Sequence, residues 1–390
     1  MDDDLRLGPI DFFSSDSQAL LNPRMPSGQA ERLTGWLSVA KTLKAQVFIL
    51  TSGSTATSEA DHKWVALPKA AILSAAAGSN SHFGSTSEDI WLHCLPDFHV
   101  GGIGIWARAF LARSKVASMD LQEGWNARRF QETVLREGAT LTSLVPAQVH
   151  DLATQRLESP RSLRAVLVGG GALSDGVYLA ARDLGWPILR TYGMSEAASQ
   201  VATEPLSDLD RRATGADVNY QVLPHLEAKA SERGQLCVRG ASLLSGYVSL
   251  DAKGKPRFWD PKDANGWFTT EDLGSVEGRK LTMHGRTNDR IKIGGEIANL
   301  ALLRETLASQ LSEHENPAAF ALVAVPDARL ESVIALVTEG EPAVESLIER
   351  FNAQVMPFER IRQRYSVRQI PRSELGKVKW AELLALLPKP

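Results

Sequence analysis

Residues 51–55 read TSGST and place hydroxyl side chains around one glycine, directly after the apolar run at 46–50. Hydroxyls and the N–H groups that a glycine leaves accessible donate hydrogen bonds to oxyanions, and Lys63 adds a positive charge shortly afterwards. We therefore expect a phosphate-binding loop here. The acids Glu59 and Asp61 would oppose a triphosphate, so we expect that part to point outward. An ordinary surface loop is the alternative.

Generic nucleotide-binding motifs explain the glycines poorly. The Walker pattern fails, because no Gly-Lys pair follows Gly53 at the required spacing. Gly102, Gly104 and Ala107 satisfy a dinucleotide-binding pattern, but such a fingerprint normally follows the first strand of its unit. His99, just before these glycines, suggests a substrate loop instead. The glycines at 169–171 could simply form a tight turn between a strand and a helix.

These loops must be positioned by regular elements, and the pattern predicts alternating strands and helices. An additional helix is expected over 27–44. We expect strands at 45–50, 89–96, 162–171 and 187–193, and helices at 69–83, 102–112 and 176–185. This order is typical of a parallel sheet with helices on its faces, where ligands gather at the carboxyl ends of the strands. The fold class is therefore predicted to be α/β.

The predicted secondary-structure pattern changes twice in the second half of the sequence. Short β-like pieces separated by glycine begin near residue 213. After Arg290 we expect helices at 297–311 and 343–355, with adjacent strands at 318–327 and 331–340. We predict a boundary between Arg286 and Arg290, which divides a large domain (1–287) from a small α+β domain (289–390).

Composition narrows the possible partners. The 390-residue chain is 43% hydrophobic and 23% charged, with a net charge of −3, so a nucleic-acid partner is not expected. Cys94 and Cys237 lie in apolar stretches and are predicted to be free buried thiols, which suits a reducing cytoplasm. The acidic amino end lacks a signal-peptide pattern, and no apolar run reaches about 18 residues, so no membrane span is expected.

Several stretches taken in order carry a more specific signal. They are TSGST (51–55), GGGAL (169–173), TYGMSE (191–196), GQLCVRG with SGY (234–247), GWFTTEDLG (266–274), GRTNDRIKIGGE (285–296) and PRSELGK (371–377). Their order and spacing resemble the acyl-adenylate-forming (AMP-binding) superfamily over residues 46–380. The resemblance implies a two-domain fold and an ATP-dependent reaction that joins a carboxylic acid to a thiol through an acyl-AMP intermediate.

Within this superfamily, LPDFHVGGIGI at 95–105 and the compact length are most similar to the o-succinylbenzoate–CoA ligases of menaquinone biosynthesis. The resemblance then implies ATP, Mg²⁺ and coenzyme A as cosubstrates and cofactor, and a small carboxylic acid as substrate. The phosphate loop begins closer to the amino end than is usual in the family. Part of an amino-terminal subdomain is therefore expected to be shortened.

The resemblance assigns site roles to matching positions. Phosphate binding falls to Thr51, Ser52, Gly53, Ser54, Thr55 and Lys63, although Ala56 stands where the family has another residue. The residues expected in and around the adenine pocket are Gly169, Gly170, Gly171, Tyr192, Gly193 and Ser195. Asp272 and Arg286 are expected to bind the ribose. Gly294 and Gly295 are expected to let coenzyme A pass close to the backbone. Taken alone, Asp272 could close a turn and Arg286 could form a surface ion pair.

Three residues receive catalytic roles in the same way. Glu196 resembles the carboxylate that holds Mg²⁺, for which carboxylate oxygen is a suitable ligand. Lys377 resembles the lysine that bridges the carboxylate and the α-phosphate, and the preceding glycine favours it over Lys379. His99 would border the acyl pocket, with a core histidine as the alternative. Asn288 is expected to be the hinge between the domains.

Alternatives remain open at this point. Arg108 or Arg190 could meet a second substrate carboxylate, and the sequence does not choose between them. The chain could be a non-catalytic nucleotide- or acyl-binding relative, or it could transfer its acyl group to a carrier protein instead of free coenzyme A. A homo-oligomer is possible.

Overall fold

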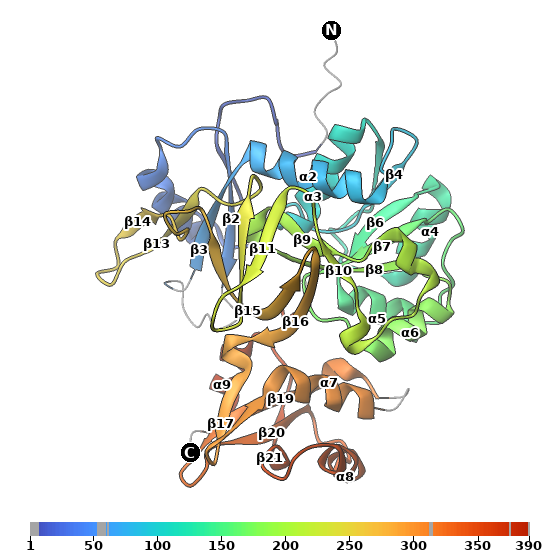
Figure 1. Ribbon diagram of the computed structural model, residues 1–390, viewed down its shortest axis with the longest axis vertical. Helices are drawn as coiled ribbons and strands as arrows, with labels where there is room; N and C mark the ends of the chain where they lie inside the picture. The colour runs from blue at the N-terminus through green and yellow to red at the C-terminus, as the bar shows by residue number, and fades with distance from the viewer. Residues whose placement is uncertain (1–7, 53–59, 61, 312–314, 374–375, 389–390) are drawn as a thin grey trace.

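The computed structural model describes residues 8–52, 60, 62–311, 315–373 and 376–388. Its strands and helices lie in two bodies, with the carboxyl-terminal elements, coloured orange to red, below the rest (Figure 1). Within the described ranges the strands form sheets of eleven, five, three and two strands. The α/β class predicted from the sequence is confirmed.

An 11-stranded sheet runs through the larger body in the order β11-β12-β15-β16-β10-β9-β8-β7-β6-β4-β5. Its parallel part comprises β4 (Ile90–His93), β5 (Lys115–Ser118), β6 (Leu141–Leu144), β7 (Ala165–Val168) and β8 (Ile188–Met194). Its antiparallel part comprises β9 (Ser199–Thr203), β10 (Tyr220–Val222), β11 (Leu226–Ala230), β12 (Gln235–Gly240), β15 (Phe268–Glu277) and β16 (Lys280–Arg286). Every residue of β6 and β7 is buried, as expected for central parallel strands.

A five-stranded sheet completes the larger body. It contains β1 (Gln18–Leu20), β2 (Gln46–Ser52), β3 (His62–Pro68), β13 (Gly246–Leu250) and β14 (Pro256–Trp259). Val47 and Val65 of this sheet share one buried cluster with Val201 and Leu281 of the 11-stranded sheet, which ties the two sheets together. The helices of this body are α1 (Ser27–Gly35), α2 (Lys69–Phe83), α3 (Val100–Ala112), α4 (Ala127–Glu137), α5 (Pro146–Thr154) and α6 (Asp175–Asp183).

The carboxyl-terminal elements have a core of their own, which includes Leu303, Leu336 and Phe351. The strands are β17 (Arg290–Ile293), β18 (Glu296–Asn299), β19 (Phe320–Asp327), β20 (Glu331–Glu339) and β21 (Ile361–Val367). The helices are α7 (Leu300–Gln310), α8 (Glu345–Gln354) and α9 (Trp380–Leu386). A 3₁₀ turn, Thr287–Asp289, joins β16 of the large sheet to β17.

Two predicted helices differ from the structure by three residues or more at one end, and α3, α6 and α8 differ by one or two residues. The helix expected over 27–44 ends at Gly35, a weak helix former, and a 3₁₀ segment (Trp36–Ala40) follows and buries Trp36 and Ala40. The helix expected from residue 297 begins at Leu300, because 297–299 pair with β17 and the Asn299 side chain caps the helix. The prediction also omitted β3, β5, α4, β6 and α5.

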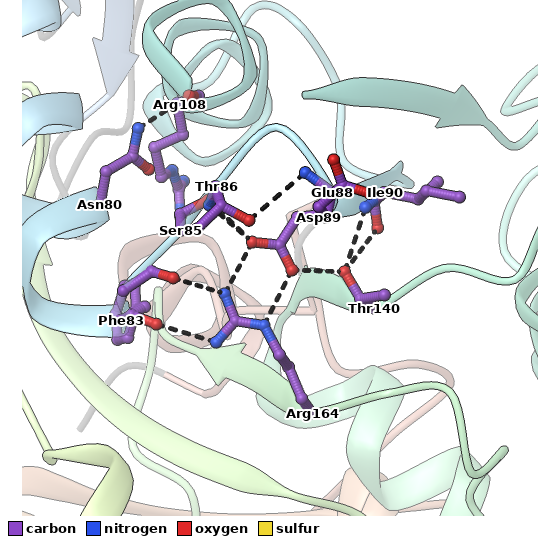
Figure 2. Close-up of polar contacts among 11 residues, drawn as sticks. Asn80, Phe83, Ser85, Thr86, Glu88, Asp89, Ile90, Arg108, Thr140 and Arg164 are labelled. Atoms are coloured by element: carbon purple, nitrogen blue, oxygen red, sulfur yellow. Dashed lines mark hydrogen bonds and ion pairs between the residues drawn. The ribbon is translucent and has the colours of Figure 1, made fainter. Parts of the chain in front are cut away.

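An ion pair with a buried carboxylate ties α2 to the parallel strands (Figure 2). Arg164 donates from Nε to Asp89 Oδ1 at 2.8 Å and from Nη2 to Oδ2 at 2.7 Å, and also donates to the carbonyl of Phe83. Thr86 and Thr140 donate to the same carboxylate. Burial alone would raise the pKa of Asp89, but these donors outweigh it and lower the pKa to about 2.

We expect Asp89→Asn to lower the free energy of unfolding by about 2 kcal/mol, because the partly exposed Arg164 loses its charged partner. A carboxylate with a depressed pKa stabilises the fold above its unfolded pKa, near 3.8, and loses this effect as the pH falls through about 2. Denaturant titrations between pH 7 and 2 should therefore show the wild-type advantage shrinking below about pH 4. The exposed neighbour provides the control: Glu88→Gln should leave stability unchanged. An Asp89→Asn variant as stable as wild type at pH 7 contradicts this account.

Candidate active site

The predicted phosphate loop connects the antiparallel strands β2 and β3. Thr51 pairs with Lys63 in the strand register, and its hydroxyl donates to the Lys63 carbonyl at 3.3 Å. Lys63 therefore lies on β3, a strand that the sequence analysis did not predict, rather than in the loop. The Ser52 side chain, Gly53, Ser54, Thr55, Glu59 and Asp61 lie outside the described residues.

Glu196 lies in a 3₁₀ turn, Ser195–Ala197, between β8 and β9. Its Oε1 accepts a 2.7 Å hydrogen bond from the Tyr247 hydroxyl and lies 3.4 Å from Lys63 Nζ. The next residues hold left-handed backbone conformations that are uncommon for non-glycine residues, with φ of 56° at Ala198 and 132° at Ser199. The surrounding fold thus imposes a strained turn on this carboxylate, as functional sites often do.

The turn around Glu196 also needs its glycine. A Cβ on Gly193 would lie 2.0 Å from the carbonyl oxygen of Ser199, so the backbone of β8 and β9 approaches too closely for any side chain. At the end of β7, a Cβ on Gly169 would lie 2.4 Å from the Thr191 hydroxyl, so a larger residue there would displace the Thr191 side chain. Gly170 has φ of 81°, and Gly171 lies beside Pro146. The predicted adenine-side residues therefore meet at the carboxyl ends of β7 and β8.

Tyr192, Asp272 and Arg286 form one hydrogen-bonded group. The Tyr192 hydroxyl donates to Asp272 Oδ2 at 2.8 Å, and Arg286 Nε donates to Oδ1 at 2.8 Å. Burial and the Asp272 charge raise the pKa of Tyr192, so its hydroxyl stays a donor. A hydrogen-bonded carboxylate next to an aromatic ring and a cation suits the hydroxyls of a ribose.

A tight loop near the carboxyl end holds Lys377. The Lys377 amide donates to the Ser373 hydroxyl, and Ser373 N donates to the Lys377 carbonyl at 2.7 Å. Arg372 Nη1 donates to the Gly376 carbonyl at 2.9 Å, and Gly376 has φ of 73°. The glycine predicted to mark this lysine is thus required by the loop conformation.

This loop reaches the larger body. A Cβ on Gly376 would lie 2.8 Å from the Ala147 side chain at the start of α5. Desolvation and Arg286 lower the pKa of Lys377, while Asp272 and Glu196 oppose that shift, so all of these groups lie within electrostatic reach. Lys379 instead pairs with Glu382 at 2.8 Å on the surface. Lys377, although exposed, therefore lies within electrostatic range of Glu196, Asp272 and Arg286, whereas Lys379 is paired with Glu382.

The remaining predicted residues lie at the start of α3 and in the turn between β17 and β18. His99 is the residue before α3, with its ring 4.6 Å from that of Phe98. A Cβ on Gly102 would lie 2.2 Å from the Pro96 carbonyl oxygen, so the glycine lets the helix pack on the preceding loop. Gly294 and Gly295 form the β17–β18 turn, where Gly294 N donates to the carbonyl of Leu330.

The structure separates the two arginines that the sequence left as alternatives. Arg190 is neutralised by Glu204, which accepts from its Nη2 at 2.7 Å and from its Nε at 3.1 Å. Arg108, 2% exposed, packs over the Trp91 ring and donates from Nε to the carbonyl of Gly104. Its Nη1 is buried with no partner within the described residues, and burial lowers the pKa of Arg108 to about 9. A buried guanidinium in this state calls for an anion.

Mg²⁺ chemistry fits the donors around Glu196. The described part of the chain has no group of three or more histidine, cysteine or acidic side chains that could hold a metal. One carboxylate with phosphate oxygens and water is, however, the usual environment of Mg²⁺ in nucleotide sites.

Both cysteines are free and buried. None of the described helices combines the length and apolar character needed to cross a bilayer.

Comparisons with known proteins agree with this geometry. The model of the AMP-binding enzyme family matches residues 35–248, more than half of the chain. The chain is 27% identical to a probable 2-succinylbenzoate–CoA ligase of Mycobacterium tuberculosis, across 91% of the chain and 88% of the relative. It is also 27% identical to the 2-succinylbenzoate–CoA ligase of Bacillus cereus, across 88% of the chain and 70% of the relative.

Solved structures show the same fold. The o-succinylbenzoate CoA synthetase (MenE) of Bacillus subtilis, solved with the acyl-adenylate OSB-AMP, superposes with a TM-score of 0.77 at 20% identity and covers 96% of this chain and 84% of that one. The ordered motifs, the clustered charged residues and the family match lead to one conclusion: the chain belongs to the AMP-binding enzyme family.

Proposed function

We propose that the chain is an ATP-dependent acid–CoA ligase that converts o-succinylbenzoate to o-succinylbenzoyl-CoA for menaquinone biosynthesis. The observation that carries the reaction type is that the Lys377 loop approaches Ala147 of the larger body, which places Lys377 within electrostatic range of Glu196, Asp272 and Arg286. A non-catalytic nucleotide binder has no need of a lysine delivered to that position. The names of the curated relatives support the acid and the thiol.

The residues suit the first half-reaction. The substrate carboxylate attacks the α-phosphorus of ATP, so that a new P–O bond forms and pyrophosphate leaves. Negative charge gathers at this step, so preorganised cations lower the barrier more than a nucleophile would. Lys377 would contact the attacking carboxylate and α-phosphate, and Asp272 would hold the ribose. A Mg²⁺ ion at Glu196 supplies further charge neutralisation when bound.

Arg108 favours a dicarboxylic acid. A buried guanidinium without a carboxylate partner among the described residues is costly unless a ligand neutralises it. It lies on α3, which starts directly after His99, and a Cβ on Gly104 would lie 2.8 Å from its Nη2. We propose that Arg108 meets the carboxylate of o-succinylbenzoate that does not react, a second carboxylate that benzoate lacks.

In the second half-reaction, the sulfur of coenzyme A attacks the acyl carbon, forms a thioester and displaces AMP. We propose that the domains are 1–287 and 289–390, and that the second turns about Asn288 to exchange the Lys377 loop for the Gly294–Gly295 turn. The Thr287–Asp289 turn joins β16 of the 11-stranded sheet to β17 of the two-stranded sheet. We place the reaction in the cytoplasm, and we retain a homo-oligomer as a prediction.

The hinge makes a separate prediction. Asn288→Pro should fix φ near −65° and restrict rotation at this residue. We expect the variant to form acyl-AMP and to lose thioester formation by more than about 10-fold, because hinge residues must absorb the φ/ψ change. Pyrophosphate release and thioester formation measured on the same preparation test this. A folded variant that performs both steps at wild-type rates rules out the hinge.

A pyrophosphate-release assay tests the proposed function. Purified protein is given Mg²⁺–ATP and, in turn, o-succinylbenzoate, benzoate and octanoate, each with and without coenzyme A. We expect release limited to one equivalent with o-succinylbenzoate alone and repeated turnover with coenzyme A. Release that coenzyme A does not accelerate would indicate a carrier-protein acceptor. No release with any acid would contradict the ligase, and a preference for octanoate would contradict the assigned acid alone.

A further inference from the structure

The tyrosine of the SGY stretch at 245–247 contacts Glu196, the candidate metal ligand. Tyr247 lies on β13 and is 3% exposed. Its hydroxyl donates to Glu196 Oε1 at 2.7 Å, across 51 positions of sequence. We propose that Tyr247 is a positioning residue that fixes one oxygen of the Glu196 carboxylate, so that the other oxygen is presented to Mg²⁺. This inference rests on the proposed adenylation reaction.

The fold holds the tyrosine ring firmly. β13 pairs with β3 on one side and with β14 on the other, and Tyr247 is opposite Val65 and Trp259 in these registers. The Tyr247 and Trp259 rings pack with their centroids 5.0 Å apart. A ring confined in this way places its hydroxyl at one point, which is what a positioning residue requires.

The same segment holds Glu196 by its backbone as well. Leu244 N donates to the Glu196 carbonyl at 2.9 Å, so residues 244–247 contact both the main chain and the side chain of Glu196. Within the described part of the chain, the hydrogen bond and the ion pair recorded for the carboxylate both involve Oε1. Since no described residue contacts Oε2, we assign this oxygen to the cation.

Lys63 explains why a fixed donor matters. Its Nζ lies 3.4 Å from the same Oε1 and 4.1 Å from the centre of the Tyr247 ring, and its side chain is 35% exposed. An ammonium at this distance competes with a metal for the carboxylate. The tyrosine hydroxyl satisfies Oε1 without a positive charge, so Lys63 can move to the phosphates while Glu196 keeps its orientation. Without the hydroxyl, the ammonium becomes the main partner of the carboxylate.

Tyr247→Phe tests this, because it removes the hydroxyl and keeps the ring that packs on Trp259 and Lys63. Mn²⁺ binding is measured by electron paramagnetic resonance of free Mn²⁺, in the presence of the non-reacting ATP analogue α,β-methylene-ATP. We expect the dissociation constant of Mn²⁺ to rise about 10-fold, as is typical when a residue that orients a metal ligand is removed. Binding of the analogue in EDTA should be unchanged. The Mg²⁺ concentration for half-maximal pyrophosphate release should rise in parallel, while thioester formation from preformed acyl-AMP should remain at wild-type rate.

Tyr178→Phe is the matched control, since Tyr178 is also buried but belongs to α6 and packs in a different core cluster. It should leave Mn²⁺ affinity unchanged. An unchanged Mn²⁺ affinity in Tyr247→Phe, or equal weakening of analogue binding with and without metal, would overturn the positioning role. Failure of the ligase proposal is distinguishable, because the wild-type protein would then release no pyrophosphate with any acid.

Discussion

Lys377→Ala is expected to lower the rate of acyl-AMP formation by on the order of 10²–10³-fold, because an ammonium aimed at charge that develops in the transition state is removed. The loop of Ser373 and Gly376 holds this lysine within electrostatic range of Asp272, Glu196 and Arg286. Formation of the thioester from chemically prepared acyl-AMP should remain within a few-fold of wild type, because no phosphate transfer occurs in that step. Single-turnover assays of the two half-reactions measure both rates.

Lys379→Ala is the control for this prediction. Lys379 is two positions away and pairs with Glu382 on the surface, so its loss should leave both half-reactions unchanged. Equal losses in both half-reactions of Lys377→Ala would show that the lysine supports the loop or the fold, and would remove it from the adenylation step.

Arg108→Met should lower kcat/KM for o-succinylbenzoate by on the order of 10²-fold, since truncating one partner of a buried charge pair costs several kcal/mol. The loss should be much smaller for the analogue in which the carboxylate that does not react is replaced by a primary amide. The melting temperature should stay the same or rise, because the variant removes a buried charge that has no carboxylate partner among the described residues. Kinetics with both acids and thermal unfolding provide the measurements.

Arg136, an exposed arginine of α4, gives the control for this variant: Arg136→Met should leave activity with both acids unchanged. A parallel loss of activity with both acids, accompanied by a lower melting temperature, would identify Arg108 as a structural residue. The dicarboxylate assignment would then lose its support in the structure, while membership of the AMP-binding enzyme family would be unaffected.

Local pattern was sufficient for much of the fold. Helix α2 begins and ends where the sequence predicts, because an alanine-rich run lies between Pro68 and the left-handed Gly84. Strands β7 and β8 follow from apolar runs that end in glycines. By contrast, β3 was missed, although its residues 64–67 are buried, because their continuous apolar run is ambiguous without knowledge of its pairing with β2 and β13.

The site was only partly predictable for a related reason. Motifs in the sequence named Glu196, Asp272 and Lys377, but the partners of Asp272 depend on strand pairing, and the place of Lys377 depends on the approach of the carboxyl-terminal body. Tyr247 belongs to the SGY motif, but the sequence did not indicate its role, because its partner Glu196 lies 51 positions away. Arg108 could be chosen over Arg190 only when Glu204 was seen to neutralise the latter.

The hydrogen bond between Tyr192 and Asp272 constrains the shape of the whole nucleotide site. These residues belong to β8 and β15, which are separated by β9, β10 and β16 in the sheet. Four interstrand spacings of about 4.8 Å would hold β8 and β15 about 19 Å apart in a flat sheet, too far for a 2.8 Å hydrogen bond between these side chains. The sheet must therefore curl, and its curvature sets the distance between the residues proposed for the adenine on β8 and those proposed for the ribose on β15. Substitutions that change the twist of β9 or β10 should then alter nucleotide affinity from a distance, by opening or closing this curl.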